Sequence, residues 1–132
     1  MAKYVYPALI TKEEDGYSVC FPDVSGCYTC GKDLAEAISM AEDALALVLY
    51  EMEVSKEVIP TATELQCVSC KQNEIVTLIC CDTLTYRKMY DKAAVKKTLT
   101  IPNWLNLMAE EANINFSQLL QEALKEKLAV KL

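Results

Sequence analysis

The side chains in this sequence that most readily suggest chemistry are its cysteines. Two CxxC pairs, Cys27 with Cys30 and Cys67 with Cys70, are separated by 36 residues. Two such pairs are nominally the ligand set of a four-thiolate zinc site. The gap, however, holds a long helical pattern where a zinc ribbon would have a short loop. We therefore expect no metal or other cofactor. A zinc-binding structural protein that uses the two CxxC pairs is the alternative.

A catalytic function is disfavoured by the residues that are missing. There are seven cysteines, an odd number that indicates reduced thiols, and no histidine, which removes the commonest general base. A two-metal nuclease would need several converging carboxylates. Here Asp23 falls in a predicted turn, Asp82 ends a predicted strand, and other acidic residues lie in a hairpin tip or on an exposed helix face. We expect no catalytic residues and no enzyme activity.

A third candidate set lies near the C-terminal end. Lys96, Thr98 and Thr100 alternate with Leu99 and Ile101, the period-two pattern of a half-buried strand. Lysine can donate hydrogen bonds to guanine, and threonine can donate, accept, or contact a thymine methyl group. The polar face of this strand is therefore a candidate base-reading surface; an ordinary solvated strand face is the alternative.

Two short helices are predicted after this strand. Pro102 suits a first helical turn, and a helix is expected from about Asn103 to Ala112, ended by Asn113. Asn115 with Gln118 forms a capping-box pattern that opens the second helix. Apolar residues recur at helical spacing in both. A unit this small cannot bury such a surface alone, and its strand has no partner. Two copies would solve both problems with a shared core of Leu99, Ile101, Trp104, Leu105, Met108, Leu119, Leu120 and Leu124.

The N-terminal part has a different pattern. Strands are predicted over residues 3–10, 17–21, 27–30 and 74–82, with Pro7 suggesting an edge position or a bulge. A helix is predicted from Leu34 to Met52 with Asp33 as its N-cap. The order β-β-β-α-β predicts an α+β layer of helix on sheet. A short connecting helix is expected over residues 84–91.

The net charge divides the chain into an acidic and a basic part. Of the 132 residues, residues 1–85 carry 5 lysines against 14 acidic residues, a net charge of −9. Residues 86–132 carry 8 basic against 5 acidic residues, a net charge of +3. The acidic part suits a basic partner and the basic part suits nucleic acid. We expect neither a secretory signal nor a membrane span, and therefore a cytoplasmic protein.

One run of the sequence resembles a known family. FPDVSGCYTCGKDLAEAISMAEDAL is similar to the signature of HicB antitoxins, and the C-terminal stretch resembles a ribbon-helix-helix unit. The resemblance implies a partial ribonuclease H-like toxin-binding domain at residues 1–83, a connecting helix or linker at 84–94, and a ribbon-helix-helix DNA-binding domain at 95–132. Cysteine is common without metal at the position of Cys27 in such sequences.

The resemblance also implies a function. A HicB-type antitoxin binds a small HicA-like toxin that cleaves messenger RNA, and represses its own operon by binding operator DNA as a homodimer or tetramer. In ribbon-helix-helix proteins the residues two, four and six positions before the first helix read bases, which selects Lys96, Thr98 and Thr100. Phosphate contacts are expected from Lys97, Asn115, Phe116 and Ser117. The alternative is a stand-alone ribbon-helix-helix regulator whose N-terminal domain senses a small molecule.

Overall fold

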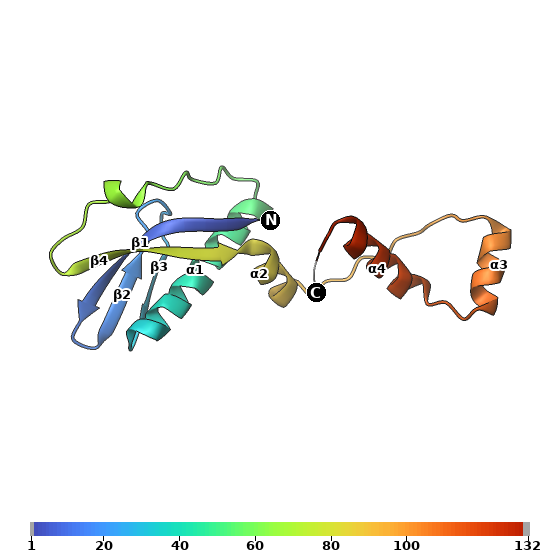
Figure 1. Cartoon of the computed structure of the whole chain (residues 1–132), viewed down its shortest axis with the longest axis horizontal. Coiled ribbons are helices and arrows are strands. Elements are labelled where there is room, and N and C mark those ends of the chain that lie inside the picture. The colour runs from blue at the N-terminus through green and yellow to red at the C-terminus, as the bar shows by residue number, and fades with distance from the viewer. Residues whose placement is uncertain (1, 131–132) are drawn as a thin grey trace. The chain divides into compact units, whose positions relative to one another are not determined.

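The N-terminal part of the protein contains an antiparallel sheet of four strands in the order β3-β2-β1-β4 (Figure 1). The computed structural model describes residues 2–130. β1 is Lys3–Glu13, β2 is Gly16–Cys20, β3 is Tyr28–Gly31 and β4 is Glu74–Asp82. The mixed α+β class predicted from the sequence is confirmed. The chain forms two compact units, Met1–Ala93 and Ala94–Leu132, which are described separately.

Pro7 lies where β1 has a strand neighbour on one side. Pro7 is opposite Leu78 of β4, whereas the register with β2 begins only at Leu9, opposite Cys20. A proline lacks the N–H of a ladder bond and is tolerated at edge positions. β1 is an inner strand of the sheet, but at Pro7 it is locally an edge.

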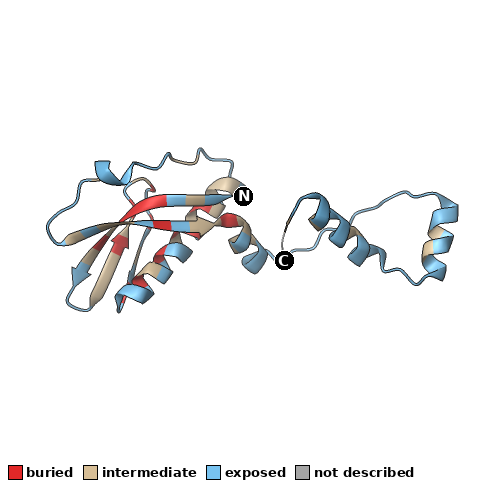
Figure 2. Cartoon of the chain, in the orientation of Figure 1, coloured by how far each residue is buried: buried red, intermediate tan, exposed pale blue. Residues whose placement is uncertain are grey.

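The core of the first unit lies between the sheet and helix α1, Leu34–Val54. Tyr6, Ala8 and Ile10 share one face of β1 and are buried, because alternate residues of a strand point the same way. Small side chains on α1, Ala37 and Ala41, are fully buried against this face. Figure 2 shows that the buried residues are confined to the first unit.

Gly31 allows α1 to approach the end of β3 closely. A Cβ atom on Gly31 would lie 2.3 Å from the backbone nitrogen of Ala37. This distance is too short for a residue with a side chain to be accommodated at this position. The second helix of this unit, α2 (Thr83–Tyr90), begins directly after β4. The ring of Tyr86 lies 5.3 Å from that of Tyr50 on α1. The helix predicted as a connector therefore packs within the first unit, whose boundary falls after Ala93.

Glu53 joins three elements near the C-terminal end of α1. Its Oε2 accepts a hydrogen bond of 2.7 Å from the hydroxyl of Tyr4 and lies 3.0 Å from the Oγ1 of Thr83. The hydroxyl of Thr83 accepts a further bond from the backbone nitrogen of Ala2. The bond to Glu53, with burial acting in the same direction, raises the pKa of Tyr4 to about 12. Burial acts to raise the pKa of Glu53, but the hydrogen bonds that it accepts outweigh burial and lower it.

The second unit contains two short helices, α3 (Asn103–Glu111) and α4 (Phe116–Lys127). Residues 91–102 form neither helix nor strand. The strand predicted over residues 96–101 is thus not formed by the single chain, because a strand needs a neighbour to complete its hydrogen bonds. Among the residues that the structure describes, no helix is both long and apolar enough to cross a membrane.

The lowered pKa of Glu53 gives a pH-dependent contribution to stability. Glu53→Gln should lower the free energy of unfolding at pH 7 by about 1 kcal/mol, because charge-assisted hydrogen bonds from Tyr4 and Thr83 are weakened. The difference from wild type should be present above the ordinary glutamate pKa of 4.5 and should vanish as the pH falls through the lowered pKa of the folded state.

Urea denaturation at pH 7 and at pH 3 measures this difference, with Glu51→Gln on the exposed face of α1 as the matched control. A Glu53→Gln effect that is independent of pH, or equal to that of the control, would show that the carboxylate does not stabilise the fold as described.

Candidate functional site

The extended segment before α3 displays the residues predicted to read DNA. Lys96, Thr98 and Thr100 are all exposed. Lys97 is exposed as well, and it lines a groove together with apolar residues of the same unit. The structure leaves these side chains accessible; whether they contact bases stays a prediction.

Local sequence signals explain how the two helices of this unit begin and end. Asn113 has a φ of +56°, the left-handed conformation predicted to stop α3. The side chain of Asn115 accepts a hydrogen bond of 3.1 Å from the backbone nitrogen of Gln118, which confirms Asn115 as the N-cap of α4. The reciprocal bond of a capping box, from the backbone nitrogen of Asn115 to the side-chain oxygen of Gln118, is not formed; the side-chain nitrogen of Gln118 donates to Glu122 at 3.3 Å.

The start of α4 is a candidate phosphate-binding site. The first N–H groups of a helix have no acceptor within it. Asn115 satisfies that of Gln118, which leaves the N–H groups of Phe116 and Ser117 for another acceptor. The helix dipole favours an anion at this position. The predicted contacts of Asn115, Phe116 and Ser117 with a DNA phosphate are therefore geometrically available.

The apolar residues predicted to form a dimer core are not covered within the single chain. No residue of α3 or α4 is buried. Leu99 is 64% exposed, Trp104 is 63% exposed and Met108 is 61% exposed. Most of the remaining predicted core residues are exposed as well: Ile101, Leu105, Leu119 and Leu124. Leu120 is intermediate.

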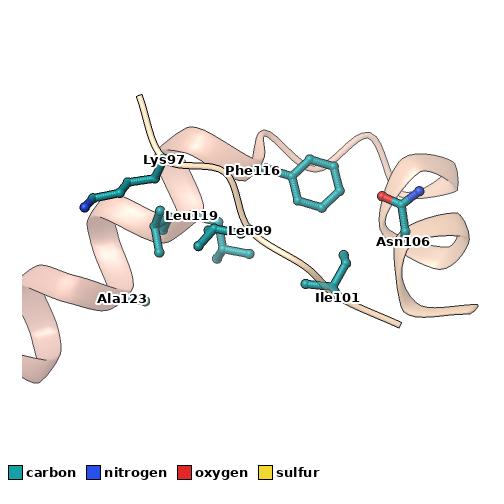
Figure 3. Close-up of a pocket in the computed structure, with 8 residues that line it drawn as sticks. Lys97, Leu99, Ile101, Asn106, Phe116, Leu119 and Ala123 are labelled. Carbon is teal, nitrogen blue, oxygen red and sulfur yellow. The ribbon is translucent and has the colours of Figure 1, made fainter. Parts of the chain in front are cut away.

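Part of this apolar surface forms an open groove of about 480 Å³ between the extended segment and α4. Figure 3 shows Leu99 and Ile101 projecting from the extended segment toward the side of Leu119 and Phe116. Leu120 and Ala123 complete the apolar lining. Uncovered apolar surfaces of this kind are typical of interaction sites.

The four CxxC cysteines differ in their exposure. Cys27 is buried, whereas Cys30, Cys67 and Cys70 are exposed. Within residues 2–130, no group of three or more cysteine, histidine or carboxylate side chains is placed to hold a metal ion. Burial raises the pKa of the Cys27 thiol to about 11, so this buried sulfur is a neutral thiol at pH 7.

Three aspartates of the first unit have structural roles. Asp23 accepts hydrogen bonds from the backbone nitrogen and the hydroxyl of Thr63, at 2.9 and 2.6 Å, and so fixes the long loop after α1. Asp82 accepts from the first backbone nitrogens of α2. Asp33 caps α1. These acids are engaged in turns and helix caps on separate elements.

Solved structures with a similar fold indicate the class to which this protein belongs. The fold is similar to that of a chain in a toxin–antitoxin complex from Streptococcus pneumoniae, with a TM-score of 0.62, 25% identity, and coverage of 95% of this chain and 99% of that chain. It is also similar to the crystal structure of the antitoxin HicB3, with a TM-score of 0.53, 26% identity, and coverage of 94% and 97%.

The family follows from the sequence itself. The model of the family described as HicB-like antitoxin of bacterial toxin–antitoxin systems matches residues 6–124, so this chain belongs to that family. The predicted resemblance to HicB antitoxins is confirmed. An uncharacterised 14.9 kDa protein of Haemophilus phage HP1 is 36% identical over 62 residues, a match that spans 47% of each chain. The chain thus covers about half of the length of that curated relative.

Proposed function

We propose that this protein neutralises a HicA-like, messenger-RNA-cleaving toxin in the cytoplasm and represses its own operon by binding operator DNA. The observation that carries this proposal is the family match over residues 6–124, which extends across both compact units. The similarity to a chain from a toxin–antitoxin complex supports a toxin partner. Inhibition by occlusion of the toxin's active site requires no catalysis by this chain.

The first unit is the proposed toxin-binding part, with a partial ribonuclease H-like shape. Residues 1–93 carry 8 basic and 15 acidic residues, a net charge of −7. A basic toxin would be attracted to this surface, because complementary charge accelerates association and suppresses wrong partners.

Toxin binding is tested with the small basic protein encoded beside this gene. Co-expression of the two chains should yield a stable complex through size-exclusion chromatography. The purified toxin should cleave messenger RNA, and an equimolar amount of this chain should abolish that cleavage. If the neighbouring protein neither binds nor is inhibited, the antitoxin role fails, and a stand-alone regulator becomes the better account.

The second unit is the proposed dimerisation and DNA-binding part. Two copies would pair their 96–101 segments as antiparallel strands and cover the exposed apolar residues of α3 and α4 with each other. Such a two-stranded ribbon fits the major groove of B-DNA. Lys96, Thr98 and Thr100 would then project from one face of the ribbon, and further association to a tetramer would cover successive half-sites.

Leu120→Asp tests the shared core. An unpaired carboxylate in a buried apolar interface is strongly unfavourable, so the variant should be monomeric by light scattering and should lose operator binding. Leu107→Asp is the matched control, because Leu107 is 52% exposed on α3 and lies outside the predicted core. A dimeric Leu120→Asp variant would contradict the proposed interface.

Substitution of the ribbon residues tests base reading. Thr98→Ala and Thr100→Ala should each weaken binding to the operator by about 1 kcal/mol or more, while toxin binding is unchanged. Fluorescence anisotropy with the promoter DNA of the operon measures this loss. If the triple variant with Lys96, Thr98 and Thr100 all replaced by alanine still binds the operator as wild type does, these residues are not the reading face.

A further inference from the structure

A second groove lies on the first unit, lined by residues of α1, β4, α2 and the start of β1. Figure 1 labels these four elements. Its volume is about 440 Å³, and its residues all fall within residues 1–93. We call it the acidic groove. Its lining combines carboxylates with large exposed side chains.

The charge of the acidic groove is negative. Glu42 and Asp43 from α1 and Asp82 from the end of β4 line it, against the single lysine Lys3. Asp82 is already used, because its Oδ1 accepts the first N–H groups of α2. Glu42 and Asp43 are exposed, and among residues 2–130 neither has a hydrogen-bond or ion-pair partner. These two carboxylates are available to a cationic group from outside.

The apolar part of the acidic groove is held in place by ring contacts. Tyr86 lies between two other tyrosines, 5.3 Å from the ring of Tyr50 and 4.5 Å from that of Tyr90. Tyr90 is nevertheless 62% exposed, and its neighbour Met89 is 58% exposed. A rigid aromatic surface loses little conformational entropy on binding, which is why tyrosine is enriched where proteins bind one another.

Carboxylates beside exposed aromatic rings favour one kind of group. A guanidinium can pair with a carboxylate and stack on a ring face at the same time, which an ammonium does less well. Arg87 already illustrates the stacking within this unit, since its guanidinium carbon lies 4.9 Å from the ring centroid of Tyr50. The acidic groove offers exposed carboxylates and the exposed ring of Tyr90 to an arginine supplied by another protein.

We propose that the acidic groove receives an arginine-bearing segment of the toxin partner, with Glu42 and Asp43 pairing with the arginine and Tyr90 contacting it. This proposal rests on the proposed antitoxin function and assigns the residues that meet the toxin. The net charge of −7 over residues 1–93 attracts a basic protein in general, whereas the acidic groove provides the specific contact.

The test compares two double variants that remove the same charge. Glu42→Gln with Asp43→Asn empties the acidic groove of its available carboxylates. Glu14→Gln with Asp15→Asn removes two exposed acids from the β1–β2 hairpin. The probe is the small basic protein encoded beside the gene, titrated by calorimetry into each full-length chain. Circular dichroism confirms that each variant is folded.

The groove variant should bind the toxin at least roughly tenfold more weakly, whereas the hairpin variant should change affinity less than about threefold. Tyr90→Ala should also weaken binding. Equal affinities of the two double variants would overturn the groove assignment and leave the antitoxin function intact. An absence of binding by the wild type would instead overturn the antitoxin function itself.

Discussion

The uncovered apolar surface of the second unit is the strongest physical constraint on how this protein can assemble. In the single chain, α3 and α4 have no buried residue, although leucine, methionine, phenylalanine and tryptophan recur along them. Exposure of such a surface is unfavourable by about 25 cal/mol for each Å², so a partner that covers it gains substantial free energy. A second copy of the chain offers a matching surface by symmetry.

The first unit has the opposite character, because it completes its own core. α1 buries a stripe of small and medium side chains against the sheet, and Glu53 ties the end of α1 to β1 and to the start of α2. Its acids cap helices and fix a loop, as Asp33, Asp82 and Asp23 show. An acidic unit that completes its own core, joined to a unit with an uncovered apolar surface, fits the proposed function with two kinds of partner.

Most of the local structure could be predicted from the sequence. The apolar periodicity after Asp33 predicted α1, and EIVTLICCD predicted β4 with its observed bounds. The end of α3 at Asn113 and the N-cap of α4 at Asn115 could be predicted, because each depends on one residue and its neighbours.

The features that depend on distant contacts could not be predicted. The packing of α2 on α1 depends on Tyr50 meeting Tyr86, which no local pattern indicates. The acidic groove brings together residues from both ends of the first unit. The proposed ribbon strand over residues 96–101 would need a second chain, and the single chain forms no strand there. The proposed roles of Lys96, Thr98 and Thr100 would need that same pairing.

Molar mass in solution, measured together with the emission of the single tryptophan, tests the central claim most directly. Trp104 is 63% exposed in the single chain of 14.7 kDa. We predict a mass of at least twice that value at micromolar concentration, and a shift of the emission to longer wavelength when dilution separates the copies. A chain that stays at 14.7 kDa with solvent-exposed tryptophan emission at every concentration would contradict the shared core.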